Sequence, residues 1–214
     1  MAIKYHPNID LDKLKSFSAK SHKSEAPPEL FNESDIDTNK RPTKLDRESI
    51  FAYTSGAIYR QMNHLVRQGG YLGFGQDSLK DDKIKKSTKQ LQSAFSRLKL
   101  VNDAILYRGI RSNEFRGVKP GQIIVNKGFT STTTDKRVAT TAFGGNNHIL
   151  MHITAAKGIP AIDTKGLSDI NESEVILPAH SHFLVHHVKK EGNSTHIFAT
   201  WIGHDEEKTN KNIN

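Results

Sequence analysis

The chain has 214 residues, in which 31 lysines and arginines outnumber 23 aspartates and glutamates, so its formal net charge is +8. It contains no cysteine, which excludes a disulfide scaffold, a thiolate zinc site and a cysteine nucleophile. No stretch approaches the ~18–20 apolar residues of a membrane-spanning helix, and the N-terminal residues lack the apolar run of a signal peptide. We therefore expect a soluble protein without membrane insertion, which stays in the cytoplasm or enters a host cell by a dedicated route.

Residues 1–45 are polar and lack a sustained apolar period, which predicts a flexible N-terminal arm. Apolar residues then recur every three to five positions over 46–68, which indicates one helix, or two that break near Gly56. A further helix is expected from Asp81 to Leu98, because the aspartate suits the N-terminal end of a helix dipole and the apolar residues share a face.

Short β-rich runs separated by glycine, proline and asparagine follow the helices. They span residues 104–110, 121–134, 148–155, 174–190 and 195–203. Helices followed by strands favour an α+β fold with a mostly antiparallel sheet over an alternating βαβ fold. We interpret residues 46–203 as one folded domain and residues 204–214 as a polar tail.

Two glutamates at the start of one predicted strand offer paired carboxylates. Glu172 and Glu174 are two residues apart, so their side chains would point to the same face of the strand. One carboxylate of such a pair can stabilise developing positive charge while the other accepts a proton. Two solvated acids at a strand end would give the same pattern.

An arginine and a run of hydroxyl residues accompany the glutamates. Arg108 lies inside an apolar strand before Gly109, where a guanidinium can hold a phosphate through two parallel hydrogen bonds. Ser131 begins a Ser-Thr-Thr run whose hydroxyls can orient neighbouring polar groups. A surface arginine and ordinary strand threonines would explain each feature taken alone.

Together these motifs resemble those of the arginine-type mono-ADP-ribosyltransferases, which include bacterial toxins and phage enzymes. The order is Arg108, then Ser131 to Thr133, then Glu172-x-Glu174. Two further segments are similar to the toxin branch: Tyr53 followed by 63–67 (Asn-His-Leu-Val-Arg), and the alanine-to-phenylalanine turn over 139–145. The resemblance covers roughly residues 46–202. In this sequence Thr133 replaces the usual serine, and Gly109 stands where some toxins carry a second arginine.

The resemblance implies the ADP-ribosyltransferase fold, with two packed, roughly perpendicular antiparallel sheets, N-terminal helices and a cleft for NAD. It implies transfer of ADP-ribose from NAD to a protein side chain through an oxocarbenium-like state, with release of nicotinamide. The catalytic residues would be Glu174, Glu172, Ser131 and Arg108. The residues that bind NAD would be Arg108, Gly109, Arg67, Asn63, Tyr53, Ser131, Phe143 and Glu174. Glu174 would face the cation, Ser131 would orient Glu174, and Phe143 would pack against nicotinamide.

Glu172 points to the acceptor, because family members with glutamate at this position usually modify arginine. A guanidinium is a poor nucleophile until a carboxylate orients it and takes its proton. The expected partner is a host protein bearing an acceptor arginine, such as actin, a GTPase or an RNA polymerase subunit. We expect a monomeric toxin, effector or phage enzyme that needs no metal and hydrolyses NAD as a side activity.

Three other functions stay open on the residues alone. Histidines at 180, 182 and 186 would alternate onto one face of the strand predicted over 174–190, and such a face can hold a metal ion. The basic excess is concentrated in the arm and the helices, and it could bind nucleic acid, although no base-reading motif accompanies it. The helical lysines are Lys83, Lys85, Lys86 and Lys89. A basic binding module on the same fold, without catalysis, is the third alternative.

Overall fold

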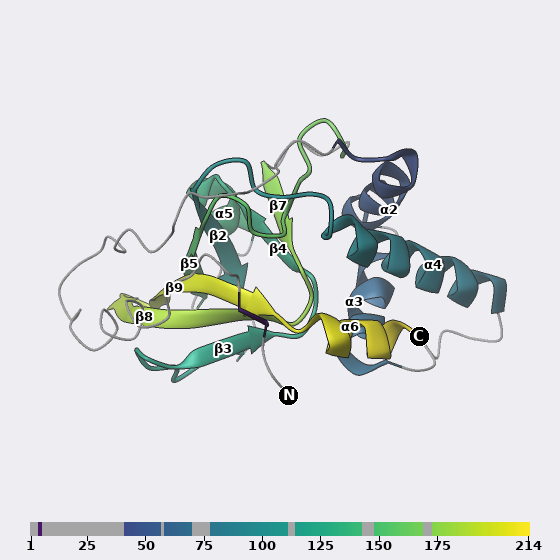
Figure 1. Ribbon diagram of the computed structural model, residues 1–214. Coiled ribbons are helices and arrows are strands. Elements are labelled where there is room, and N and C mark those ends of the chain that lie inside the picture. The colour runs from purple at the N-terminus through teal and green to yellow at the C-terminus, as the bar shows by residue number, and fades with distance from the viewer. Residues whose placement is uncertain are drawn as a thin grey trace.

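The computed structural model describes residues 4–5, 41–56, 58–69, 78–110, 114–142, 148–168 and 173–214. Four helices lie together at one end of the molecule, and the strands form the other end (Figure 1). These helices are α2 (Lys44–Thr54), α3 (Tyr59–Gln68), α4 (Ser78–Ala94) and α6 (Glu206–Ile213), while α5 (Lys136–Ala142) packs on the sheet.

Helices α2 and α3 are two separate elements, so of the two alternatives predicted for residues 46–68 the structure has the pair that breaks near Gly56. Gly56 has φ +78°, a left-handed conformation that ends α2. The start of α2 is a capping box, in which Asp46 N–H donates to Thr43 Oγ1 (3.2 Å) and Thr43 N–H donates to Asp46 Oδ2 (2.8 Å). Arg97 also donates to the buried Asp46 carboxylate, which fixes the segment after α4 to the start of α2.

The described strands form one mixed sheet of nine strands, in the order β3-β8-β9-β5-β2-β4-β7-β6 with β1 paired to β9. Their bounds are β1 Lys4–Tyr5, β2 Ala104–Ile110, β3 Ile123–Asn126, β4 Thr130–Thr133, β5 Ile149–Ala155, β6 Ile162–Asp163, β7 Glu174–Leu177, β8 Ser181–Glu191 and β9 Ser194–His204. Strands β5 and β9 run parallel, and the other named pairs are antiparallel. The predicted α+β class is therefore confirmed.

Strand β7 belongs to two hydrophobic cores because side chains alternate between the faces of a strand. Val175 and Leu177 pack in the core formed by the sheet. Ile176 packs in a second core together with the helices, whose contributors include Leu65 of α3 and Ile213 of α6. The helices are thus held against the strand that begins with Glu174.

Three predicted boundaries differ from the structure. The run 121–134 is divided into β3, which pairs with β8, and β4, which pairs with β7. The run 174–190 is divided into β7 and β8 by a turn, in which His180 adopts φ +53°. Residues 206–213 form α6 instead of a polar tail: Lys208 N–H donates to Asp205 Oδ1 (2.9 Å), and Ile213 is buried. The helix was missed because its sequence contains a single large apolar residue, too few to show a period. Most of the predicted arm, residues 6–40, lies outside the described residues.

None of the described helices is long and apolar enough to cross a membrane.

Candidate active site

Ser131 and Glu174 lie on neighbouring strands and share a face of the sheet. Strands β4 and β7 pair antiparallel, with Thr133 opposite Glu174 and Ser131 opposite Ile176. Residues opposite each other in such a pair point to the same side, and residues two apart on a strand do so as well. Because Ile176 faces the helices, Ser131 and Glu174 also face them. Both are half-buried, so they are held in place and still reachable from solvent.

Arg108 is joined directly to the strand that carries Ser131. It extends from β2, and its Nη1 donates to the carbonyl oxygen of Ser131 at 2.8 Å. Burial lowers the pKa of Arg108, and repulsion from Arg67 lowers it further, while attraction to Glu114 and Glu174 raises it. Arg108 therefore lies within electrostatic range of Arg67 and of Glu174, the glutamate that is predicted to be catalytic.

Tyr53 supports Ser131 from the helical layer. Its hydroxyl lies 3.2 Å from Ser131 Oγ and accepts a hydrogen bond from Asn63 Nδ2 at 3.0 Å. The ring is 4% exposed and packs edge-on against Phe129, with ring centroids 5.6 Å apart. Burial raises the pKa of Tyr53, so its hydroxyl keeps its proton near neutral pH. Because that hydroxyl accepts from Asn63, its proton is available to Ser131, and the Ser131 proton is available to a neighbouring carboxylate.

Helix α3 presents two further polar side chains at the same place. Asn63 is 8% exposed, and within the described part of the chain its Oδ1 has no hydrogen-bond partner. Arg67 lies one turn further along α3 and is exposed. Two guanidiniums within electrostatic range of each other are suited to a ligand that carries negative charge, as the diphosphate of NAD does.

The model of the family described as "ART: NAD:arginine ADP-ribosyltransferase" matches residues 20–206. The chain belongs to this family. The resemblance inferred from Arg108, the Ser131 run and Glu174 is thereby confirmed.

Two proteins named as NAD(+)–arginine ADP-ribosyltransferases are similar in sequence. The protein Mav of Mycobacterium avium (strain 104) is 28% identical over 147 residues, which are 67% of this chain and 16% of that protein. EFV of Enterococcus faecalis (strain ATCC 700802 / V583) is 31% identical over 116 residues, which are 52% of this chain and 22% of that protein. The chain thus spans about a fifth or less of the length of these relatives.

The fold is that of ADP-ribosyltransferase toxins. The structure of Vis from Vibrio splendidus, solved in complex with agmatine, superposes with a TM-score of 0.60 at 19% identity and covers 92% of this chain and 87% of Vis. The C3 exoenzyme of Clostridium limosum gives a TM-score of 0.59 at 17% identity over 75% of this chain and 86% of C3. The predicted ADP-ribosyltransferase fold is confirmed by these two superpositions.

The remaining predicted site residues fall in two groups, one within the described residues and one outside them. Gly109 is buried in β2 opposite Leu150. Glu172 and Phe143 lie outside the described residues, so their roles stay predictions from the sequence.

Glu114, an exposed residue that sequence reasoning missed, contributes negative charge near Arg108. Its only signal in the sequence is its place six residues after that arginine.

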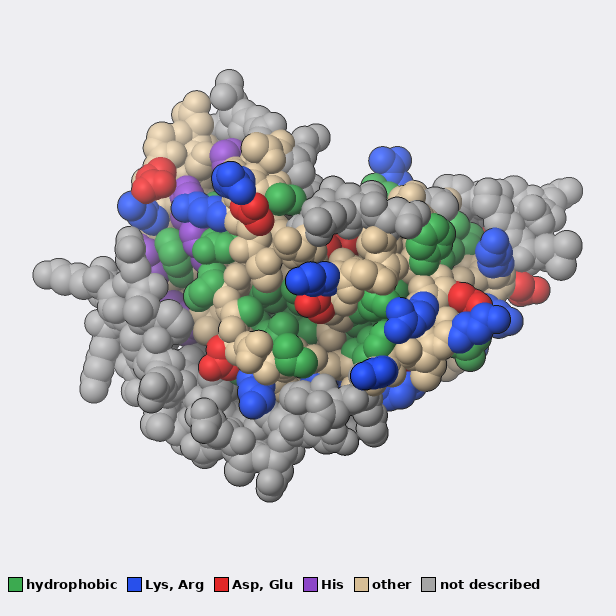
Figure 2. Space-filling model, turned by 90° about the horizontal axis from the view of Figure 1, so that it is seen from above, with side chains coloured by type: hydrophobic (Ala, Val, Ile, Leu, Met, Phe, Trp, Pro, Cys, Tyr) green, Lys and Arg blue, Asp and Glu red, His purple; other side chains and the backbone are tan. Residues whose placement is uncertain are grey.

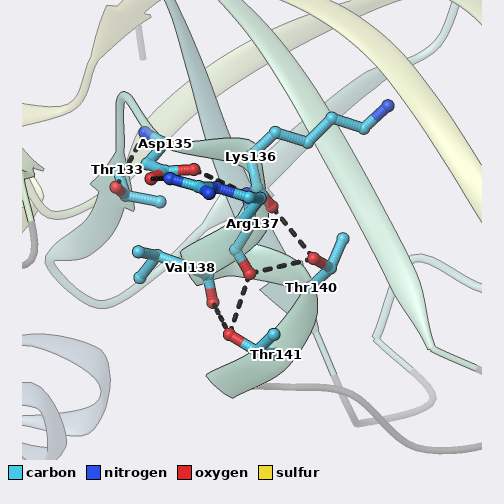
Figure 3. Close-up of polar contacts among 7 residues, drawn as sticks. All are labelled: Thr133, Asp135, Lys136, Arg137, Val138, Thr140 and Thr141. Atoms are coloured by element: carbon cyan, nitrogen blue, oxygen red, sulfur yellow. Dashed lines mark hydrogen bonds and ion pairs between the residues drawn. The ribbon is translucent and has the colours of Figure 1, made fainter.

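The end of β4 turns directly into α5 through a local network of hydrogen bonds (Figure 3). Asp135 N–H donates to Thr133 Oγ1 (3.0 Å), and the Asp135 carboxylate accepts from Arg137 N–H (2.8 Å) at the start of α5. The Thr140 hydroxyl donates to the carbonyl oxygens of Lys136 and Arg137. Thr133, which stands where the family usually has serine, thus serves to end the strand.

The histidines do not form the single-faced row that the metal hypothesis required. His180 lies in the turn after β7 with Nδ1 3.0 Å from Thr209 Oγ1, and His186 Nε2 lies 2.7 Å from Thr200 Oγ1. Burial lowers the pKa of both histidines to about 4. Among the described residues no group of three or more histidines, aspartates or glutamates could hold a metal ion. Figure 2 shows histidine side chains gathered at the strand end of the molecule, with basic and acidic side chains beside them.

Proposed function

We propose that this protein is a mono-ADP-ribosyltransferase that transfers ADP-ribose from NAD to arginine side chains of a host protein. One observation carries the proposal. Arg108 donates a hydrogen bond to the carbonyl oxygen of Ser131, and Glu174 lies on the same face of the sheet as Ser131. These are the three residue types on which the family's chemistry depends, and they come from three different strands.

NAD supplies the ADP-ribosyl group and carries nicotinamide as the leaving group. Transfer breaks the bond between the nicotinamide nitrogen and C1′ of its ribose, and nicotinamide departs as a neutral molecule with the electron pair of that bond. An acceptor guanidinium nitrogen forms the new bond to C1′ and loses one proton. The protein must therefore hold two phosphates, stabilise positive charge on the ribose and accept a proton.

The described residues account for the first two tasks. Arg67 and Arg108 supply paired positive charge for the diphosphate, and Asn63 holds the Tyr53 hydroxyl that bonds to Ser131. Glu174 supplies the negative charge that stabilises the ribose, and fixed charges of this kind typically contribute the largest part of a rate enhancement. The Tyr53 hydroxyl keeps Ser131 oriented beside Glu174.

Glu172 is assigned the third task from its place in the sequence, two residues before Glu174. A carboxylate there would orient the acceptor guanidinium and take its proton, which makes arginine the acceptor. Agmatine carries the same guanidinium group, and Vis, which shares the fold, was crystallised with it. The likeness to bacterial toxins supports a host protein as the natural target.

The proposal is tested with the purified chain, labelled NAD and either agmatine or a host lysate. The parent should label agmatine and a discrete protein band, and Glu174→Gln should reduce both transfer and NAD hydrolysis by ~10²–10³-fold. Glu207→Gln, the same change on an exposed residue of α6, should leave both activities unchanged. Loss of only a few-fold in a folded Glu174→Gln variant would contradict the role given to Glu174.

A second variant separates the two glutamates. Glu172→Gln should suppress transfer to agmatine while NAD hydrolysis continues. In hydrolysis the acceptor is water, so no guanidinium has to be oriented and deprotonated by Glu172. Equal loss of both activities would place Glu172 on NAD or on the fold, and transfer at the parent rate would remove the support for an arginine acceptor. A parent that never modifies NAD would favour the binding module without catalysis.

A further inference from the structure

Gly128 lies between β3 and β4, two residues before β4 begins, and it is buried against helix α3. Several glycines of the described chain have positive φ, but Gly128 is not among them. Its backbone is therefore compatible with an L-residue such as alanine. The need for glycine at this position must come from the space around its Cα.

That space is taken by the ends of two side chains from α3. A Cβ built on Gly128 would lie 2.6 Å from Asn63 Oδ1, 2.8 Å from Arg67 Nε and 3.0 Å from Arg67 Nη2. These distances are too short for real contacts, so something must move when a methyl group is added. All three atoms are at the ends of side chains and none belongs to the backbone, so the side chains would move and the fold would be kept.

The displaced groups are the two that α3 contributes to the candidate site. The Arg67 guanidinium lies over Gly128 and remains exposed on its outer side, within electrostatic range of Arg108. Asn63 Oδ1 is buried at the same point, while Asn63 Nδ2 donates to the Tyr53 hydroxyl. Gly128 thus sets how closely the α3 side chains approach the strand that carries Ser131.

We propose that Gly128 is a positioning residue for NAD binding, which acts by leaving room for the Arg67 guanidinium to lie against the backbone that enters β4. In this position Arg67 and Arg108 are held as a pair of fixed spacing for the diphosphate. The inference rests on the proposed function, since it assigns Gly128 a task in binding NAD.

The test is Gly128→Ala in the full chain, with steady-state kinetics of NAD hydrolysis. The KM for NAD should rise ~10-fold or more, the size expected for one misplaced charge-assisted hydrogen bond, while kcat changes much less. The thermal midpoint should stay close to that of the parent, because only side-chain ends move. An unchanged KM would overturn the proposal, and so would a variant that no longer folds, because that would make Gly128 a packing residue.

A double-mutant cycle shows whether the effect passes through Arg67. Arg67→Ala should itself raise KM, and adding Gly128→Ala to it should raise KM by a much smaller factor than in the parent, because the effect that passes through Arg67 is gone and only the displacement of Asn63 remains. Independent, multiplying effects of the two changes would overturn the proposal. A purely structural role of Gly128 would not give this dependence on Arg67.

Nuclear magnetic resonance separates this inference from the proposed function. The Nε–H resonance of Arg67, assigned by its loss in Arg67→Ala, should shift in Gly128→Ala, and titration with inorganic pyrophosphate should then perturb it less than in the parent. If the parent neither binds nor cleaves NAD, the proposed function fails, while the displacement of Arg67 is still measured. An Arg67 resonance identical in parent and variant would overturn the positioning role.

Discussion

Replacing Tyr53 by phenylalanine isolates the hydrogen bonds between the helical layer and the catalytic strand. The ring would keep its contact with Phe129, but Asn63 Nδ2 and Ser131 Oγ would lose the hydroxyl that joins them. Asn63 is 8% exposed, so water cannot readily replace its lost partner. A buried donor left without a partner costs ~1–3 kcal/mol.

We expect Tyr53→Phe to lower the free energy of unfolding by about 2 kcal/mol, which is ~4–8 °C in thermal midpoint for a chain of this size. The kcat of NAD hydrolysis should fall as well, because Ser131 is no longer oriented, whereas the KM for NAD should change little. The matched control is Tyr59→Phe, since the Tyr59 hydroxyl bonds only to exposed Arg60 among the described residues. If both variants have the same midpoint and kcat, Tyr53 does not support the site.

Two further changes test the charges that stabilise the fold. Arg97→Met should cost ~3 kcal/mol in urea unfolding, because it leaves the buried Asp46 carboxylate without its ion pair, whereas Arg137→Met removes an exposed pair and should cost under ~0.5 kcal/mol. Equal losses of unfolding free energy in Arg97→Met and Arg137→Met would refute the role given to the buried ion pair. His180 and His186 have pKa values of about 4, below the ordinary 6.5, so the unfolded chain binds more protons and stability should decrease as pH falls from 6.5 to 4. Titration of their ring protons near pH 6.5 would contradict it.

The sequence was sufficient to place three of the predicted site residues in strands. Arg108, Ser131 and Glu174 each lie in a short β-rich run, and the pattern of each run placed the residue in the strand where the structure has it. The order of the motifs resembles that of the ADP-ribosyltransferases, and this resemblance predicted the fold. Strand pairing could not be predicted in the same way, because the contact of β4 with β7 joins residues more than forty positions apart.

The sequence identifies the predicted site residues of the helices, but it does not indicate which contacts their side chains make. Tyr53 is predicted from the sequence to bind NAD, and the structure adds that its hydroxyl lies 3.2 Å from the Oγ of a serine 78 positions away and that its side chain is buried. Nothing in the local pattern indicates such a contact. The turn at His180 did have a signal that was missed: Pro178 interrupts the run, and proline is rarely found inside a central strand.

The candidate site lies where the strands and the helices meet. The strands supply Arg108 and Glu174, while α3 supplies Arg67, and the spacing between them depends on how α3 is held. Part of that support comes from the last helix, since Asn212 Nδ2 donates to the carbonyl oxygen of Val66 at 2.7 Å, next to Arg67 in the chain. Residues that look like a polar tail in the sequence therefore help to set the distance between the two arginines.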